Sequence, residues 1–385
     1  MITIAVILMV LAVLYSAFVY SNIPFIKKWR TIYIETAMST MTHQWLATKF
    51  IPSDVINDVV ADMEAKLQDN QVDRSEAPPN KPTATPVAPT AEPTVEPTAE
   101  PTPEPTPSPE EIFFLMFPDI DRETVPDDFD YEAEEMSDIE DMGILTQQGD
   151  AVWAFDRVNG ILIVTVAGEG YKGKLALISD SAQVKLVPAV NAPYRGDTTK
   201  EFCESYGALI AINGSGFADP EGMGYGAYPI GFAVYDGVIA SASEGGMNQM
   251  CGYDYDDNFI IGTNLDPSTF RDAVEFYPNI ILSGKKTVTG SFGMGLQPRT
   301  EIGQTDDGKT LLLIVDGRQP GHSIGITVDT CADILLKYHC YNAINLDGGS
   351  SSTMAYRGEL ITKSSSPMTY GRYLPNAWVV MPKES

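Results

Sequence analysis

The chain has 385 residues, a length that suits one large domain with attached segments. It carries 25 Lys and Arg residues against 52 Asp and Glu residues, which gives a formal net charge of −27 at pH 7. This balance argues against a nucleic-acid partner, because such a partner needs a basic surface. Residues 1–142 hold −18 of the charge and residues 143–385 hold −9, so most of the acidity lies outside the C-terminal region.

Residues 2–20 carry no charged side chain and are long enough to span a bilayer. No small-residue cleavage site stands out after them, so we predict an uncleaved transmembrane anchor over residues 1–22 rather than a removed signal peptide. Lys27, Lys28 and Arg30 follow the span, and the positive-inside rule would place the rest of the chain in the cytoplasm. That orientation conflicts with the features described next.

Two segments separate this anchor from the rest of the chain. Residues 23–74 are predicted to be a membrane-proximal helical segment. Residues 75–142 are predicted to be a disordered linker, because 12 of the 32 residues from 78 to 109 are prolines and a mobile acidic tract from Asp119 to Asp141 is expected after them. A Pro-Thr-Glu spacer of this kind suits a domain held away from a surface. It therefore favours a single-pass cell-membrane protein with its C-terminal domain outside the cell.

Residues 143–385 are predicted to form the folded domain. Most apolar runs there are short and separated by Gly-rich turns, which is typical of sheets. One amphipathic helix stands out, because Thr327 is a good N-cap and apolar residues recur at helical spacing up to Tyr338. This helix lies between apolar strands at 311–315 and 343–346, an order typical of a right-handed β-α-β crossover. The fold class is therefore α+β: a sheet-rich mixed domain with at least one such crossover, preceded by the transmembrane helix and the disordered Pro-Thr spacer.

Polar residues end three of the predicted strands. Asp316 ends the first crossover strand, Asp347 ends the second, and Asn213 ends an earlier strand. In open sheets with such connections, ligands bind beyond the carboxyl ends of the strands, so these residues indicate a candidate site. Gly348 and Gly349 follow Asp347 and would let backbone amides approach a sugar hydroxyl or a phosphate oxygen. The alternative interpretation of this loop is a plain glycine turn that leaves a strand.

Other site chemistries fit the sequence less well. The motif GHSIG around Ser323 matches the G-x-S-x-G pattern of serine hydrolases, but Pro320 and a loop separate the serine from its strand. No P-loop motif is present. The four cysteines show no C-x-x-C spacing, which argues against zinc, and their pairing as disulfides stays open. Cys331 falls on the apolar side of the predicted helix, where we expect a buried free thiol.

Three motifs, in this order and at these spacings, resemble those of the phosphodiester glycosidase family. They are DGRQ from Asp316, S-x-G-x-T from Ser323 and NLDGGSSS from Asn345. The similarity covers roughly residues 160–381. The family includes the enzyme that removes N-acetylglucosamine from a phosphodiester to uncover mannose 6-phosphate. The N-terminal region looks like that of membrane-anchored, exopolysaccharide-related bacterial members.

The resemblance implies an enzyme that cleaves the bond between a sugar's anomeric carbon and a phosphodiester oxygen, in an extracellular or cell-wall glycopolymer. Asp316 and Asp347 would be the carboxylates that stabilise an oxocarbenium-like transition state, and Arg318 would hold the phosphate. Which aspartate is catalytic, and whether the configuration is retained or inverted, stays open. The resemblance also implies a set of residues that bind the substrate or its phosphate: Asn213, Gly214, Ser215, Arg299, Thr300, Gln319, Ser323, Thr327, Asn345, Gly348, Gly349, Ser350, Ser351 and Arg372.

No cofactor is certain from the sequence, although a divalent cation on the two carboxylates is compatible with it. The alternative to an enzyme is a non-catalytic module that binds cell wall or exopolysaccharide in the same pocket. We favour the enzyme, because the chain keeps the carboxylates as well as the glycines. The expected partners are a carbohydrate phosphodiester substrate and the membrane, and the oligomeric state stays open.

Overall fold

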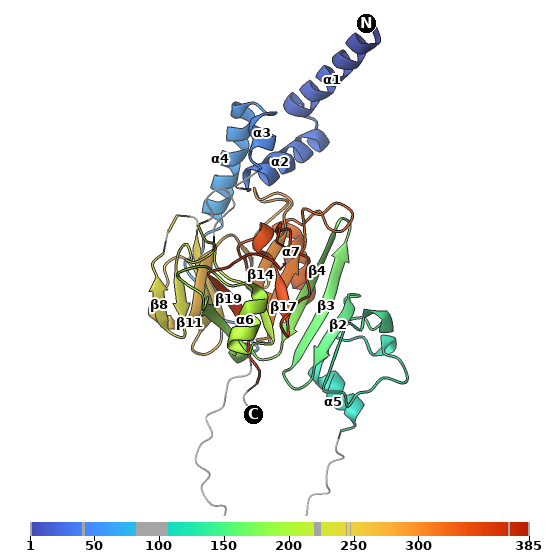
Figure 1. The fold of residues 1–385 in the computed structure, drawn as a ribbon, viewed down its shortest axis with the longest axis vertical. Coiled ribbons are helices and arrows are strands. Elements are labelled where there is room, and N and C mark those ends of the chain that lie inside the picture. The colour runs from blue at the N-terminus through green and yellow to red at the C-terminus, as the bar shows by residue number, and fades with distance from the viewer. Residues whose placement is uncertain are drawn as a thin grey trace, which may run out of the picture.

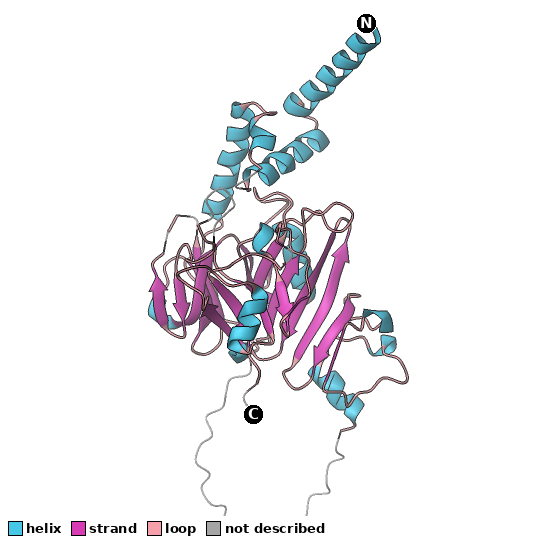
Figure 2. Ribbon diagram, viewed as in Figure 1, coloured by secondary structure: helices cyan, strands magenta, loops and turns pink. Residues whose placement is uncertain are grey.

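The computed structural model describes residues 2–40, 43–81, 107–218, 225–243, 245–246, 248–368 and 370–383. Figures 1 and 2 show a group of helices at the N-terminal end and a sheet-rich body below it. The α-helices in the described residues are α1 (Ile2–Tyr20), α2 (Pro24–Met38), α3 (Trp45–Thr48), α4 (Ser53–Asp69), α5 (Pro109–Met116), α6 (Thr199–Tyr206) and α7 (Val328–Lys337).

The strands of the described residues form three sheets. The largest has the order β1 (Glu135–Ser137), β2 (Ala151–Asp156), β3 (Ile161–Gly168), β4 (Tyr171–Ile178), β15 (Thr310–Val315), β14 (Arg299–Thr305), β16 (Cys340–Asn345), β12 (Asn279–Leu282), β13 (Lys285–Lys286). The second has the order β10 (Phe259–Gly262), β9 (Gln249–Asp254), β11 (Phe270–Phe276), β7 (Ala233–Tyr235), β8 (Val238–Ser241). The third has the order β18 (Glu359–Leu360), β17 (Met354–Tyr356), β6 (Ile210–Asn213), β19 (Asn376–Val380), β5 (Val184–Pro188).

The predicted β-α-β crossover is present. Strands β15 and β16 both pair antiparallel with β14, so they run in the same direction, and α7 connects them. The α+β class is confirmed, as is the expectation that the two strands end at one edge of the sheet. The sequence did not indicate that β14 lies between them, because sheet order depends on contacts between distant segments rather than on local patterning.

The core explains why the crossover forms from these residues. Thr327 caps α7 by accepting a hydrogen bond from the Thr330 amide at 3.3 Å, and the helix then buries Cys331 against the largest sheet. Strand β15 is buried on both faces: Leu311 and Leu313 pack on the α7 side, while the residues between them face the other sheets. A strand buried on both sides reads as a continuous apolar run, as this one does.

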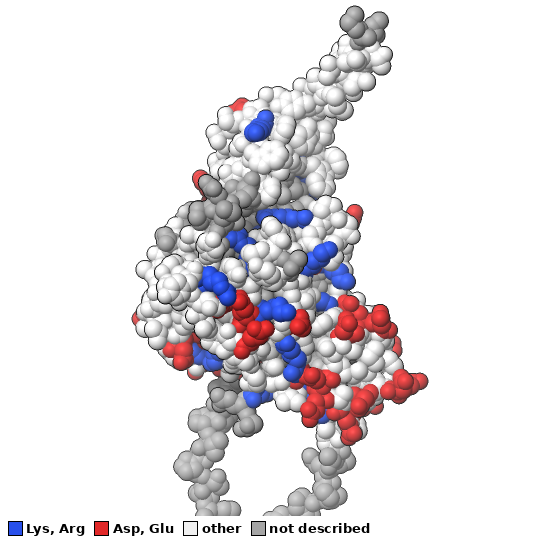
Figure 3. Space-filling view, viewed as in Figure 1, with Lys and Arg blue, Asp and Glu red and all other residues white. Residues whose placement is uncertain are grey.

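The acidic tract before residue 143 packs as part of the body, in contrast to the predicted mobility. Phe113, Phe117 and Phe129 are buried there, and the ring of Phe113 meets that of Phe155 on β2 edge to face at 5.2 Å. The carboxylates of the tract remain outside, and Figure 3 shows acidic side chains gathered over this part of the surface. The high net charge pointed to a mobile chain, although aromatic residues between the charges supply enough apolar surface to pack.

The proline-rich spacer at 82–106 lies outside the described residues, but the chain on both sides of it belongs to one body. Before it, the Ser75 amide donates to the Ile261 carbonyl at 2.7 Å, and the Asn80 amide donates to Asp306 at 2.9 Å. After it, Asp119 forms an ion pair of 3.5 Å with Lys309. The spacer therefore connects two parts of a single folded body. It does not separate the N-terminal helices from a distant domain.

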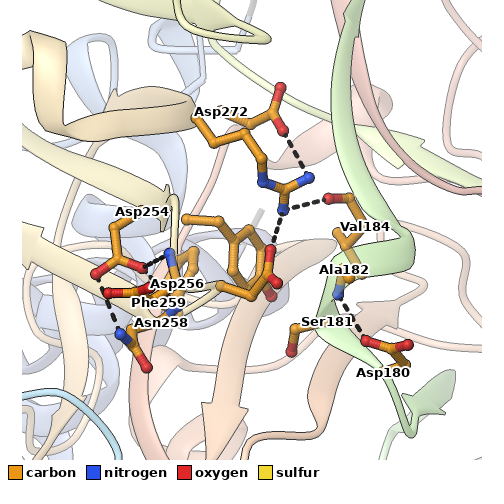
Figure 4. A network of polar contacts seen from close by, with 12 residues as sticks. Asp180, Ser181, Ala182, Val184, Asp254, Asp256, Asn258, Phe259 and Asp272 are labelled. Atoms are coloured by element: carbon orange, nitrogen blue, oxygen red, sulfur yellow. Dashed lines mark hydrogen bonds and ion pairs between the residues drawn. The ribbon is translucent and has the colours of Figure 1, made fainter. Parts of the chain in front are cut away.

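A polar network fixes the point where the described chain stops before the spacer. Asp254 accepts hydrogen bonds from the amides of Asp256 and Asn258, each at 2.9 Å, and these three residues lie side by side in Figure 4. The Lys81 ammonium donates to the carbonyl of Asp256. Burial lowers the pKa of Lys81, and the surrounding carboxylates raise it. In the same network, Arg271 of β11 pairs with Asp272 and also donates to the Val184 carbonyl of β5 at 3.0 Å, so this region joins the second and third sheets (Figure 4).

At the other end of the chain, α1 stands out from the body (Figure 1). Its segment Thr3–Tyr20 has a mean hydropathy of 2.4 and is 6% buried. Among the described residues, this is the one helix long and apolar enough to cross a membrane. Helices α2, α3 and α4 pack on one another through a small apolar cluster that includes Ile34, Ile51 and Ile56. This three-helix group lies between α1 and the sheets.

Candidate active site

The candidate site lies at the edge of the largest sheet where β15 and β16 end and β14 begins. The pairing places Arg299 of β14 opposite Val315. Asn213 arrives from β6 of the third sheet: its Nδ2 donates to the Asp347 carbonyl at 2.7 Å, and its Oδ1 accepts from the Thr300 hydroxyl at 2.7 Å. The structure therefore brings Asn213, Thr300 and Asp347 together, although they come from two sheets rather than one.

The loop after Asp347 is shaped by close backbone packing. Gly349 has a φ of +65°, and its amide donates to the Pro298 carbonyl at 3.0 Å. A Cβ on Gly348 would lie 2.9 Å from that same carbonyl oxygen. The Ser352 hydroxyl lies 3.1 Å from the Thr300 hydroxyl and donates to it, because the single proton of Thr300 goes to Asn213. These glycines thus serve the turn itself, and the amide of Gly349 is occupied by Pro298 instead of facing a ligand.

Among the three motifs of the resemblance, DGRQ supplies the one arginine, Arg318, and this arginine lies next to the loop. Its Nε and Nη2 both donate to Oε1 of Gln297, at 2.9 and 2.6 Å. A Cβ added to Gly349 would lie 3.1 Å from Nη2 of Arg318, so the guanidinium occupies the space beside this glycine. Burial lowers the pKa of Arg318, the charge of Arg299 lowers it further, and the Asp347 carboxylate raises it. Asp347 is half-buried, so a carboxylate and a guanidinium share one accessible corner of the site.

Arg372 also reaches this loop. Its Nη1 donates to the Ser350 hydroxyl at 3.4 Å, and its guanidinium lies 4.9 Å from the centre of the Phe217 ring. Arg318 and Arg372 therefore both lie beside the loop that carries Asp347 and Ser350.

Arg299 does not join them, although the resemblance implied that it binds phosphate. It is 2% exposed, and its Nη2 donates to the carbonyls of Met294 and Gly295 at 2.9 and 3.1 Å. Its Nη1 donates to Oδ1 of Asn345 at 3.4 Å. Alternation along β14 turns Arg299 and Glu301 toward α7, whereas Thr300 faces the ligand side. Arg299 and Asn345 thus lie on the buried side of the site, where they support its backbone.

Glu301 lies beside Arg299 on the α7 face of β14 and is fully buried. Burial raises the pKa of the Glu301 carboxyl to about 8 from an ordinary value of 4.5, against the opposing effect of Arg299. The folded chain therefore keeps the Glu301 proton over a range of pH in which the unfolded chain loses it.

This difference predicts a pH dependence of stability. Because the unfolded chain binds fewer protons between about pH 4.5 and about pH 8, the free energy of unfolding should fall as the pH rises through that range. Glu301→Gln should flatten this part of the dependence, since an amide does not titrate. Thermal melts of both proteins across the range measure the two slopes. Identical slopes would show that Glu301 does not titrate in this way.

Asp316, the other predicted carboxylate, faces a separate hollow. It is 4% exposed; its Oδ1 accepts from the Lys363 amide at 2.9 Å, and its Oδ2 lies 2.7 Å from His322 Nε2. Burial raises the pKa of Asp316, while His322 and the Lys363 amide lower it. The hollow has a volume of about 260 Å³, and its lining includes Trp153 and Lys174. Because β14 lies between the two strands, the strand ends that carry Asp316 and Asp347 are about 10 Å apart.

Several other predicted residues hold this edge together. The Ser323 hydroxyl is buried and donates to the Asp316 carbonyl at 2.5 Å, which excludes it as a serine nucleophile in this structure. The side-chain amide of Gln319 donates to the Lys363 carbonyl at 2.8 Å. Ser215 is also buried, and Oδ1 of Asn376 accepts from both its amide and its hydroxyl. Gly214 lies in the turn after β6, and Ser351 lies in the turn after β16. Thr327 is the N-cap of α7.

Sequence reasoning missed three residues that shape the site. His322 lies in the GHSIG motif and could have been found there, because a histidine beside a buried aspartate is a recurrent pairing. Asn376 and Gln297 gave no local signal. Gln297 bonds to Arg318 and also to α2: its Nε2 donates to the Thr36 carbonyl and to the Ser39 hydroxyl, both at 2.9 Å. Helix α2 therefore touches the site through a single glutamine.

Metal and thiol chemistry were also left open by the sequence. Across the part of the chain that the structure describes, no group of three or more His, Cys, Asp or Glu side chains is placed to hold a metal ion. All four cysteines are buried and unpaired, so the expectation for Cys331 is confirmed.

Comparison with known proteins gives the family. Residues 206–381 match the family model described as phosphodiester glycosidase. The chain is 40% identical over 80 residues to N-acetylglucosamine-1-phosphodiester alpha-N-acetylglucosaminidase of Bos taurus, which covers 20% of this chain and 15% of that protein. It is 43% identical over 68 residues to an uncharacterized SPbeta prophage-derived protein of Bacillus subtilis, which covers 18% of this chain and 10% of that protein. The chain thus spans a small part of these curated relatives.

Among solved structures, the catalytic domain of the zebrafish N-acetylglucosamine-1-phosphodiester alpha-N-acetylglucosaminidase, described as auto-inhibited by its pro-peptide, aligns with a TM-score of 0.49 at 20% identity. The alignment covers 58% of this chain and 82% of that chain. The family match begins inside α6 and ends just after β19, so it includes every motif on which the resemblance was based. Residues 206–381 of this chain therefore match a phosphodiester glycosidase domain.

Proposed function

We propose that this protein releases a sugar from a sugar-1-phosphodiester, and that the reaction takes place at the loop after β16. The observation that carries the proposal is that the loop after β16 holds the half-buried Asp347 close to Gly349, where an added Cβ would lie 3.1 Å from the Arg318 guanidinium. A glycosyl phosphodiester needs a carboxylate near its anomeric carbon and a fixed cation near its phosphate. The family of residues 206–381 supports the same chemistry.

The proposed reaction assigns different roles to these groups. The bond between the anomeric carbon and the phosphate oxygen breaks, and its electron pair stays on the phosphate, which is a good leaving group. Asp347 stabilises the positive charge that develops on the sugar, while Arg318 and Arg372 hold the phosphate oxygens. Water then supplies the hydroxyl of the released sugar and loses one proton.

We assign Asp316 a positioning role. Both of its carboxylate oxygens already have partners, the Lys363 amide and His322, and the strand spacing places it about 10 Å from Asp347. Asp316 would orient His322 and hold the 363–364 segment against the site. The Ser364 hydroxyl extends this link by donating to the Ser350 carbonyl at 3.4 Å.

The finer parts of the proposal concern location and substrate. We propose that α1 anchors the chain in the cell membrane, that the body lies outside the cell, and that the substrate is an extracellular or cell-wall glycopolymer. The run of apolar residues in α1 supports the anchor. Lys27 and Lys28 oppose the outward orientation. Arg30 counts less, because it is 8% exposed and its guanidinium bonds to carbonyls at the end of α1.

A direct assay tests the activity. The purified full chain in detergent would be incubated with alkyl N-acetylglucosamine-1-phosphate, the linkage for which the bovine relative is named. We expect release of free sugar together with an alkyl phosphate. Saturable binding of the compound without any release would favour the alternative, a glycan-binding module, and would contradict the proposed reaction.

The role of Arg318 gives a further prediction. Arg318→Ala removes a charged bidentate partner that typically contributes about 1.5–3 kcal/mol, so kcat/KM should fall roughly ten- to hundredfold. Inhibition by inorganic phosphate should weaken by a similar factor, because phosphate occupies the same subsite. Arg122→Ala is the matched control, since that guanidinium lies over the Phe114 ring, away from the site. Unchanged phosphate inhibition in Arg318→Ala would refute the assignment.

A further inference from the structure

The edge of the body that bears the candidate site is also the edge on which the N-terminal helices sit. The Leu296 amide donates to the Thr36 hydroxyl at 3.0 Å, and the Gln297 side chain donates to Thr36 and to Ser39. Gln297 in turn accepts from Arg318, so only one side chain separates α2 from the proposed phosphate-binding arginine. Figure 1 shows α2 directly over the end of the body that contains α7 and β14.

Helix α2 is also joined to α1 by side-chain hydrogen bonds. Arg30 is nearly buried, and its Nη1 donates to the carbonyls of Phe18, Val19 and Ser21 at 3.2, 2.6 and 3.1 Å. These bonds satisfy carbonyls at the C-terminal end of α1, where a cation is favourable. The stretch from the start of α2 to Thr36 spans about 20 Å at 1.5 Å per residue. Thr36, where α2 contacts Gln297, therefore lies about 20 Å along the helix from the start of α2.

The helical group also presents apolar side chains outward. Phe25 is 70% exposed, Phe50 is 52% exposed, and Trp29 and Trp45 are 45% and 47% exposed. Aromatic residues that flank a membrane helix favour the interface between headgroups and water, and the apolar stems of nearby lysines suit that depth as well. On the face that Figure 3 shows, few charged side chains lie over this group. The exposed aromatic residues near α1 are therefore suited to contact the bilayer surface, whereas α4 exposes Asp54, Asp58 and Asp62.

The rest of the body points away from that surface. The spacer is flanked by Asn80 and Lys81, which pack near Asp306 and Gly308 at the turn between β14 and β15. This turn is at the opposite end of β14 from Arg299 and the site. The described chain thus stops before the spacer at the far edge, while the site edge lies on the side of α2 and α1.

We propose that the substrate is a sugar-1-phosphodiester whose phosphate is esterified to a membrane lipid. The inference rests on the proposed function and on α1 as a membrane anchor. In such a lipid the sugar and its phosphate project from the headgroup layer toward the site edge, where Arg318 would bind the phosphate and Asp347 would lie near the sugar. Hydrolysis breaks the bond between the anomeric carbon and oxygen, adds the hydroxyl of water to the sugar, and leaves the lipid as a phosphomonoester. The extracellular substrate proposed above is thereby narrowed to one that is itself attached to the membrane.

The test compares substrate in the same membrane with substrate elsewhere. The full chain is reconstituted into phosphatidylcholine vesicles that also contain hexadecyl N-acetylglucosamine-1-phosphate. A parallel sample places that lipid in separate, protein-free vesicles, and a third uses the water-soluble butyl analogue. Because anchoring raises the effective concentration, we expect release from shared vesicles to be at least about tenfold faster than from separate vesicles at equal bulk concentration.

A variant distinguishes tight positioning from mere co-anchoring. A flexible Gly-Ser insert of about twenty residues between Ser21 and Asn22, combined with Arg30→Ala to remove the bonds to the end of α1, frees the body from α1 and should reduce the advantage of shared vesicles several-fold, while leaving butyl-analogue hydrolysis unchanged. Equal rates from shared and separate vesicles, with the butyl analogue still cleaved, would overturn the lipid substrate but keep the proposed function. Failure to cleave any of the three compounds would overturn both.

Discussion

A chain that begins at Gly143 is expected to lose its cooperative melt, because it lacks a layer of the core. Phe113, Phe114, Phe117 and Phe129 are all at least 94% buried and belong to the cluster on the α7 side of the largest sheet. Burying one such side chain contributes about 1.5–3 kcal/mol, so removing four costs roughly 6 kcal/mol or more. Typical domains have only about 5–15 kcal/mol of net stability.

The matched comparison is a chain that begins at Pro107. It restores α5, β1 and the four phenylalanines while still lacking residues 1–106. Thermal melts followed by circular dichroism should show one cooperative transition for the longer chain and a broad or absent transition for the shorter one. A Gly143 chain that melts cooperatively at the same temperature would show that residues 107–142 add nothing to the fold.

Asp347→Asn is expected to reduce the rate of sugar release by roughly a hundredfold. The change keeps the size of the side chain and removes its charge. A group that stabilises developing charge in a closed site is commonly worth about 3 kcal/mol in the transition state. The loss should appear mainly in kcat, because the carboxylate acts on the transition state more than on bound substrate. Initial rates of sugar release at several substrate concentrations separate the two effects.

Two controls make this test specific. Asp333→Asn removes an exposed carboxylate of α7 that pairs with Lys286, and it should leave kcat unchanged. Asp316→Asn should change the pH profile of kcat rather than abolish turnover, because it alters the partner of His322. If Asp347→Asn keeps the unfolding temperature and the full rate of the parent chain, the proposed site at the end of β16 is wrong.

The local elements of the fold were predictable, but their assembly was not. The α7 helix followed from its N-cap and apolar spacing, and the crossover followed from the two strands around it. The packing of residues 107–142 against the body could not be predicted, because charged residues dominate the composition of that tract. Whether it packs depends instead on a few buried phenylalanines. No local pattern in the sequence indicated that β6 belongs to a different sheet, because strand order arises from long-range pairing.

The site shows the same division. The motifs around Asp316, Asp347 and Arg318 all fall at one sheet edge, as their positions after apolar strands indicated. Arg299 was misplaced because a β-strand alternates its side chains, and the register of β14 turns this arginine toward α7. The contact between Gln297 and Thr36 joins residues 261 positions apart, and no local pattern encodes such a pairing.

The chain belongs to one folded body on both sides of residues 82–106. This arrangement determines the result of a protease cut within those residues. A single cut would produce a nicked protein of two fragments. The N-terminal fragment would stay attached through Asn70, whose side chain bonds to the Asn279 carbonyl at 3.0 Å. It would also stay attached through Ser75, whose amide bonds to the Ile261 carbonyl of β10. The fragments should elute together in gel filtration and separate only in denaturant. Cleavage of the spacer would therefore leave the body on the membrane, and shedding would require a cut between α1 and α2.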